Sequence, residues 1–148
     1  MGVFRYTVEI GNPDHTRFEP IEAWVDSGST YTWIPRSILV RLGYTPFSRR
    51  GFRLANGQRI DRDICVVPIR IGAEVLPNLV VFGDEGSQPL VGAMTLEAFS
   101  LGVDPVNRTL VPVLANALAA GVSPVAELES KAQAAKAASR QLARLSTE

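Results

Sequence analysis

Apolar and polar residues alternate along much of the chain up to residue 113, as they do in β-strands that bury one face. Residues 4–10 are the clearest case, because every second side chain is apolar and the run stops at the turn-forming residues 11–14. Shorter extended patterns, separated by glycine and proline, follow at 21–25, 31–34, 64–67, 69–72 and 79–82, with a closing hairpin at 103–113. The fold is therefore predicted to be all-β, either a barrel or a sandwich.

Helical patterns in this region are few and short. Residues 37–43 are expected to form one helical turn that ends at Gly43. A second short amphipathic helix is expected after Gly92, with Leu96 and Phe99 facing inward. Neither is long enough to change the all-β prediction.

The dipeptide Asn56-Gly57 lies between two extended arms within residues 52–60. Asn-Gly is a strong hairpin signal, because both central residues of a type I′ turn need a positive φ that these two residues tolerate. We expect a projecting hairpin here, with Ala55, Asn56 and Gly57 at its tip.

The extended run 21–25 ends at Asp26, which is followed at once by Ser27, Gly28 and Ser29. Such small residues form a tight reversal, so a half-buried carboxylate is expected where the strand ends. An ordinary surface turn after a strand would have the same local sequence. The motif by itself leaves both interpretations open.

The sequence Val25-Asp26-Ser27-Gly28-Ser29 resembles the catalytic loop of aspartic peptidases, and the short chain resembles their single-lobed, retropepsin-like branch. A second segment, Leu90-Val91-Gly92 followed by a short helix, resembles the element that packs under that loop in the family. The hairpin at 52–60 lies between the two, which is the family's order. The resemblance covers roughly residues 4–113 and implies a closed acid-protease barrel with a flap hairpin.

The resemblance also implies a role for each matching residue. Asp26 is expected to be catalytic, with Ser27, Gly28 and Ser29 supporting its loop; the Ser29 hydroxyl could donate a hydrogen bond to the Asp26 carboxylate. The other implied roles are the flap tip for Ala55, Asn56 and Gly57, and packing under the catalytic loop for Leu90, Val91 and Gly92.

Aspartic peptidases use two carboxylates that share one proton to activate water and to protonate the substrate. This chain has one Asp-Ser-Gly motif, because Asp84 is followed by Glu85 and Asp104 by proline. We therefore expect a homodimer in which each subunit supplies Asp26, hydrolysing peptide bonds of a polypeptide substrate as an aspartic endopeptidase.

Two positions depart from the retroviral pattern. Retroviral members usually carry an arginine after the second motif and an acidic residue soon after the catalytic one, and these form an ion pair that braces the dimer. Ala93 and Thr30 stand at those places. Two alternatives to catalysis thus remain open: a non-catalytic peptide-binding or regulatory module of the same fold, and a β-barrel interaction protein whose Asp26 turn is incidental.

The amino-acid composition of the chain argues against several classes of binding partner and cofactor. Fifteen basic and fifteen acidic residues in a chain of 148 give a net charge of zero, which disfavours a nucleic acid or an anionic membrane as the main partner. One cysteine, Cys65, and one histidine, His15, offer no metal-binding spacing, so no metal or cofactor is expected. No stretch resembles a secretion signal or is long enough to span a membrane, so a cytoplasmic location is expected.

The last part of the chain has a different composition. Alanine dominates residues 114–148, and Ser123-Pro124 is a typical helix start. We expect a protease-like domain over residues 1–113 and an alanine-rich helical or disordered tail over 114–148.

Overall fold

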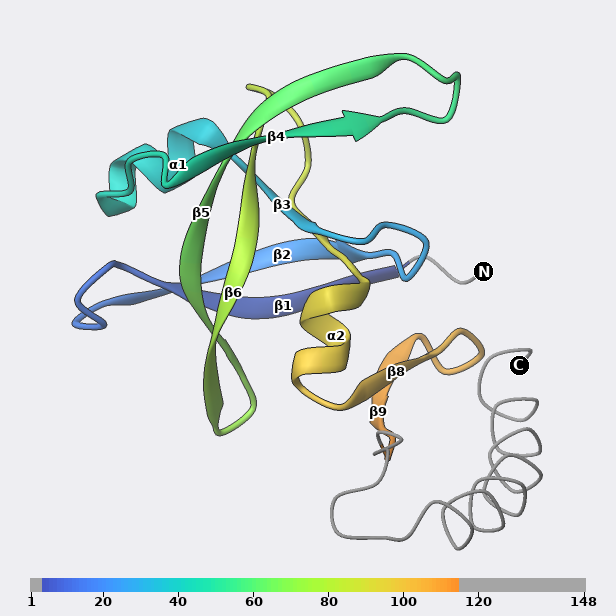
Figure 1. Cartoon of the computed structure of the whole chain (residues 1–148). Coiled ribbons are helices and arrows are strands. Elements are labelled where there is room, and N and C mark those ends of the chain that lie inside the picture. Colours follow the sequence, from blue (N-terminus) through green and yellow to red (C-terminus); the bar gives the residue numbers. More distant parts are fainter. Residues whose placement is uncertain (1–3, 115–148) are drawn as a thin grey trace, which may run out of the picture.

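The computed structural model describes residues 4–114 of the chain (Figure 1). Strands predominate, as the alternating pattern predicts. The elements in chain order are β1 (Phe4–Gly11), β2 (Phe18–Val25), β3 (Thr32–Pro35), α1 (Arg36–Leu42), β4 (Ser48–Arg53), β5 (Arg59–Ile71), β6 (Glu74–Gly83), β7 (Leu90–Val91), α2 (Ala93–Ala98), β8 (Leu101–Asp104) and β9 (Thr109–Pro112). The predicted tail at 114–148 lies, after its first residue, outside the described residues.

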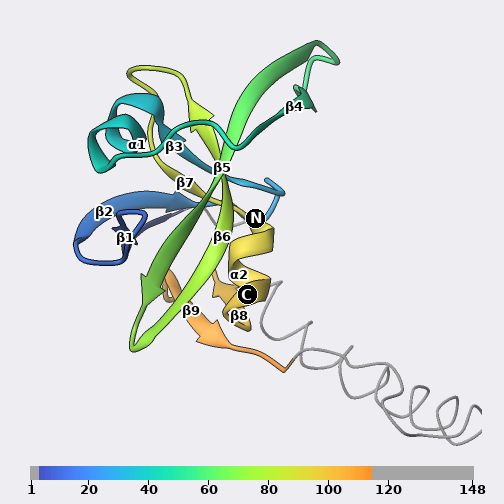
Figure 2. The same cartoon turned by 60° about the vertical axis from the view of Figure 1, so that its left-hand side comes forward.

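Seven strands form one sheet in the order β1-β2-β7-β3-β6-β5-β4. A further pairing of β1 with β5 closes six of them into a barrel and leaves β4 as an outer strand on β5. Neighbouring strands are mostly antiparallel, but β2 with β7 and β3 with β6 are parallel. The expected closed barrel is confirmed, and Figures 1 and 2 show it from two sides.

Alternate side chains of the strands fill the barrel. In β1, Phe4, Val8 and Ile10 are buried, and the residues between them are exposed or half-buried. The other strands contribute nine further buried hydrophobic side chains to this core, among them Val25 and Ile69. Leu39 and Leu42 of α1 and Leu96 and Phe99 at α2 also pack into it. Leu96 and Phe99 are both buried, which confirms that they face inward as expected. Phe99 lies directly after the last residue of α2.

Strands β5 and β6 are longer than the sequence pattern indicates. Each continues through a proline, Pro68 in β5 and Pro77 in β6, where the sequence suggests breaks. The two prolines face each other in the ladder, so both missing N–H donors fall at one pair of residues.

The hairpin over β4 and β5 is present, but the expected type I′ turn is wrong. Gly57 has a positive φ of 86°, whereas Asn56 does not. The N–H of Gly57 donates to the Leu54 carbonyl (2.9 Å), and the N–H of Leu54 donates to the Gln58 carbonyl (2.8 Å). The connection is thus a longer loop with one left-handed glycine.

Helix α1 ends at Gly43 as expected, where φ is 105°. The N–H of Gly43 donates to the carbonyl oxygens of Leu39 and Val40 in the last turn of the helix. The β8–β9 hairpin forms a separate two-stranded sheet beside α2 (Figure 1). Within residues 4–114 no helix has the length and apolar character needed to cross a bilayer.

Candidate active site

The loop from Asp26 to Tyr31 joins β2 to β3 and is held by backbone hydrogen bonds. The N–H of Asp26 donates to the carbonyl of Val91 (3.0 Å), and the N–H of Ser29 donates to the carbonyl of Asp26 (3.1 Å). The N–H of Gly28 donates to Oδ1 of Asp26 (2.9 Å), which fixes the rotamer of the carboxylate. Asp26 is half-buried, so its side chain remains open to solvent.

The short strand β7 lies directly beneath this loop. It pairs in parallel with the end of β2 through Trp24 with Leu90 and Val25 with Val91. It also pairs with β3 at Trp33. The predicted segment Leu90–Gly92 is therefore brought against the Asp26 loop, although its functional role stays a prediction.

Gly92 follows β7 at a point where the chain has no room for a side chain. A Cβ atom built at Gly92 would lie 2.3 Å from the Tyr31 carbonyl oxygen and 2.7 Å from the Ser29 carbonyl oxygen. Its φ of −101° is ordinary, so glycine is required here by space and not by backbone freedom.

The start of α2 is capped by the same loop. The N–H of Ala93 donates to the Ser29 carbonyl (2.7 Å), and the N–H of Met94 donates to the Thr30 carbonyl (2.9 Å). These bonds satisfy two donors that a helix N-terminus leaves open, and no side chain caps this helix. Thr30 and Ala93 stand at the positions where retroviral members carry the charged pair. The loop that contains Thr30 and the helix that begins at Ala93 are thus joined by backbone hydrogen bonds within one chain.

Two buried threonines tie β3 to α2 below the loop. The hydroxyl oxygens of Thr32 and Thr95 are 2.6 Å apart, and the Thr32 hydroxyl also accepts from the N–H of Gly92 (3.1 Å). Both side chains are at most 2% exposed. Sequence reasoning missed this pair, because nothing local marks two threonines so far apart in the chain as partners.

Thr32→Val is expected to lower the free energy of unfolding by about 1–3 kcal/mol, because it keeps the shape but leaves the Gly92 N–H and the Thr95 hydroxyl without their partner. Chemical denaturation measures the change. Thr32→Ser retains the hydroxyl and should lose much less. Equal stability of the valine and wild-type proteins would contradict the role given to this hydrogen bond.

The proposed hydrogen bond from Ser29 to Asp26 is not found. The Ser29 hydroxyl donates instead to the Tyr31 carbonyl (3.1 Å) and so tightens the loop from within. Ser27 and Gly28 are exposed on the loop. The expectation that Ser29 tunes the carboxylate is therefore wrong in this arrangement.

The flap hairpin projects from the barrel on the side where the β2–β3 loop lies, as both views show (Figures 1 and 2). Phe52 of β4 packs edge-on against Tyr31, with ring centroids 5.4 Å apart. It also packs against Trp33 in a tilted arrangement, with ring centroids 5.0 Å apart. The predicted tip residues Ala55, Asn56 and Gly57 all lie in the exposed turn.

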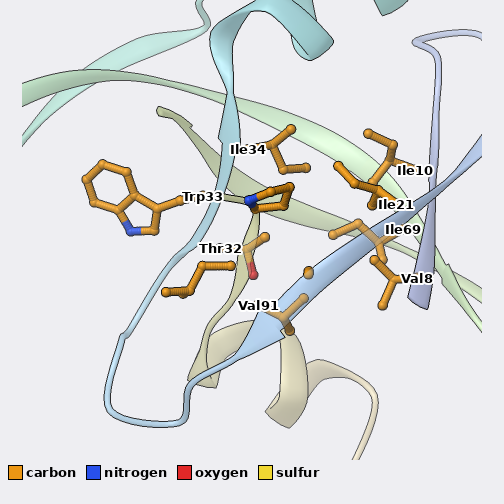
Figure 3. Close-up of a pocket in the computed structure, with 11 residues that line it drawn as sticks. Val8, Ile10, Ile21, Thr32, Trp33, Ile34, Ile69 and Val91 are labelled. Carbon is orange, nitrogen blue, oxygen red and sulfur yellow. The ribbon is translucent and has the colours of Figure 1, made fainter. Parts of the chain in front are cut away.

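The interior beneath the site is closely packed. Figure 3 shows Ile34 pointing among the apolar side chains of the barrel, while the Trp33 ring lies on the other side of β3. The cavity there measures only about 10 Å³ and cannot hold a ligand. Trp33 faces Phe52 of the flap and not this interior.

The described part of the chain offers little support for a nucleophilic cysteine or a metal centre. Burial raises the pKa of the Cys65 thiol to about 12, which makes it a poor nucleophile. No group of three or more His, Cys, Asp or Glu side chains within residues 4–114 is arranged to hold a metal ion. The carboxylate of Asp26 is thus the candidate group for acid–base chemistry at this loop.

A family model described as aspartyl protease matches residues 7–104, which include the Asp26 loop, the flap hairpin and Gly92. The chain belongs to the aspartyl protease family. It is accordingly an aspartic-type peptidase, a hydrolase, as the sequence motif indicated.

A solved structure agrees with the fold of this protease. The EIAV protease in complex with the inhibitor HBY-793 is 17% identical, with a TM-score of 0.50, covering 73% of this chain and 91% of that one. The simian foamy virus (mac) protease is 16% identical, with a TM-score of 0.47, covering 65% and 94%. No curated protein matches the chain. The predicted retropepsin-like barrel is confirmed.

Proposed function

We propose that this protease is an endopeptidase that works as a homodimer, with Asp26 of each subunit forming the catalytic pair. The observation that carries the proposal is the Asp26 loop: one half-buried carboxylate, fixed by the N–H of Gly28, at the open end of β2. Acid and base functions require two carboxylates, and one chain has one such loop. A two-fold axis through the loops would supply the second.

The reaction follows from sharing one proton between two neighbouring carboxylates, as in other aspartic proteases. The ionised Asp26 takes a proton from a bound water while the water oxygen attacks the peptide carbonyl carbon. The protonated Asp26 donates its proton to the carbonyl oxygen, giving a neutral tetrahedral diol. The C–N bond then breaks as a proton passes to the leaving nitrogen, releasing an amine and a carboxylic acid.

An extended polypeptide is the substrate that suits this arrangement. The flap is a two-stranded hairpin over the loop, and a segment laid between them could bond to backbone groups on either side. Tyr31, Trp33 and Phe52 supply apolar surface at the same place. Leu90, Val91 and Gly92 act as support for the loop and do not contact the substrate.

The test is cleavage of a mixed peptide library between about pH 4 and 7 together with sedimentation of the same sample. We expect peptide cleavage, and a specific activity that rises with protein concentration over the range in which dimers form. A monomer that cleaves at undiminished specific activity on dilution would refute the shared pair.

A second candidate is a peptide-binding module that does not cleave. It is favoured by one observation, the uncharged Thr30 and Ala93 at the places of the bracing ion pair. A stable dimer that binds library peptides without cutting them at any pH would establish this alternative.

A further inference from the structure

The flap hairpin is rich in arginine. Residues 48–64, where β4 pairs with β5, carry two aspartates, Asp61 and Asp63, and five arginines: Arg49, Arg50, Arg53, Arg59 and Arg62. Three of the five arginines form ion pairs, Arg49 with Asp63, Arg59 with Asp61 and Arg62 with Asp84. Within residues 4–114, Arg50 and Arg53 form no ion pair with a carboxylate.

The two unpaired arginines lie on opposite faces of the hairpin. Side chains alternate along a strand, so Arg50 shares a face with Phe52, and Arg53 faces the other way. Phe52 packs on Tyr31 and Trp33, which identifies its face as the inner one, toward the Asp26 loop. Arg50 is thus an exposed cation on the substrate side of the flap.

Arg50 is also held at a defined place. Its Nη1 donates to the hydroxyl oxygen of Tyr31 (3.2 Å), and Tyr31 ends the loop that begins at Asp26. This contact takes one of the five N–H donors of the guanidinium and leaves others for a ligand. The planar group is suited to a carboxylate, which it can bind through two parallel hydrogen bonds.

The charge balance of the inner face favours an anion. Arg50 lies directly opposite Arg62 in the ladder. The guanidinium of Arg62 is already met by both oxygens of Asp84, at 3.0 Å each. Like charges opposite one another destabilise a sheet, and one further carboxylate beside Arg50 would relieve this repulsion.

We infer that Arg50 selects substrates that carry an aspartate or glutamate side chain in the segment lying under the flap. This inference rests on the proposed function, because it concerns the peptide that the protease would cut. Arg50 acts as a specificity residue and takes no part in the proton transfers.

The experiment uses the full chain and sets of peptides that differ only at the positions flanking the cut site, with Glu, Gln or Lys at each. At the position that Arg50 reaches, we expect the wild-type protein to give kcat/KM about fivefold higher for Glu than for Gln, mostly through KM. Added salt should reduce this preference, since the contact is exposed. Arg50→Gln should abolish the preference, and Arg50→Glu should shift it to Lys.

Arg53→Gln is the matched control. It removes the same charge from the same hairpin, but on the outer face, and should keep the preference for Glu. Loss of the preference in both variants would show that overall charge, not Arg50, selects the substrate, and would overturn the inference. Cleavage with no preference for Glu in the wild type would also overturn it and leave the proposed function standing.

A binding measurement separates the two proposals if no peptide is cut. Glu and Gln peptides are then titrated against the wild-type and Arg50→Gln proteins, with tryptophan fluorescence as the readout. Tighter binding of Glu peptides that is lost in Arg50→Gln would support the selectivity although catalysis fails. Equal binding of both peptides would refute the selectivity as well.

Discussion

Asp26→Asn protein should fold and associate as the wild type does, yet cleave peptides about a thousandfold more slowly or not at all. Asparagine has the size of aspartate, and its amide oxygen can still accept the Gly28 N–H bond that fixes the loop. It cannot exchange a proton with water at working pH, so both carboxylate functions are lost. The measurement is kcat/KM on a peptide that the wild type cuts, with sedimentation and thermal unfolding alongside.

The matched control is Asp14→Asn, the same change in the exposed loop between β1 and β2, which should leave cleavage unchanged. Mixing tests the shared pair directly. With equal amounts of wild-type and Asp26→Asn subunits exchanging at random, activity per wild-type subunit should fall to about half, because half of those subunits then face an inactive partner. Unchanged activity per wild-type subunit would mean that each chain acts alone.

Gly92→Ala is expected to lower the free energy of unfolding by about 3–5 kcal/mol or to prevent folding. The added methyl would lie 2.3 Å from the Tyr31 carbonyl oxygen, and backbone atoms cannot rotate away as a side chain can. The loop and α2 would have to separate, which would break the bonds from Ala93 and Met94 to the loop carbonyls. Urea or thermal unfolding measures the effect.

Gly102→Ala serves as the comparison for this change. A Cβ there would meet a methyl group of Val113 at 2.9 Å, and that side chain can move. It should cost about 1 kcal/mol or less. If Gly92→Ala were as stable as Gly102→Ala, the close approach of the loop to β7 would not be a requirement of the fold.

The structure refines the comparison with retroviral members at one point. The positions that lack the ion pair, Thr30 and Ala93, lie where α2 is capped by loop carbonyls. Within one chain these bonds join backbone groups, and they need the close approach that the missing side chain of Gly92 allows. Charge is therefore not needed to hold the loop on α2 within one chain.

The strands, the hairpin at 52–60 and the Asp26 loop could be predicted from sequence because their signals are local. Alternation at residues 4–10 reports a strand with one buried face, and Asn56-Gly57 marks a hairpin. Asp26-Ser27-Gly28 reports a carboxylate at the end of a strand. Each signal lies within a few residues, so no knowledge of the rest of the chain was needed.

Details that depend on partners elsewhere could not be predicted in this way. The turn at Asn56 has one left-handed residue and not two, since the register and twist of the flanking strands select the turn type. Strands β5 and β6 continue through Pro68 and Pro77 because the prolines face each other. The Ser29 hydroxyl donates to the Tyr31 carbonyl, which comes within hydrogen-bonding distance only when the loop is folded.

The sequence by itself determined the kind of chemistry, an acid at a strand end in an aspartyl protease, because the types and order of residues carry that information. Tertiary structure alone decided which groups meet: Thr32 with Thr95, Gly92 under the Tyr31 carbonyl, and Arg50 with Tyr31 beside the loop. Such contacts join residues distant in the chain, and closure of the barrel is what brings them within hydrogen-bonding distance.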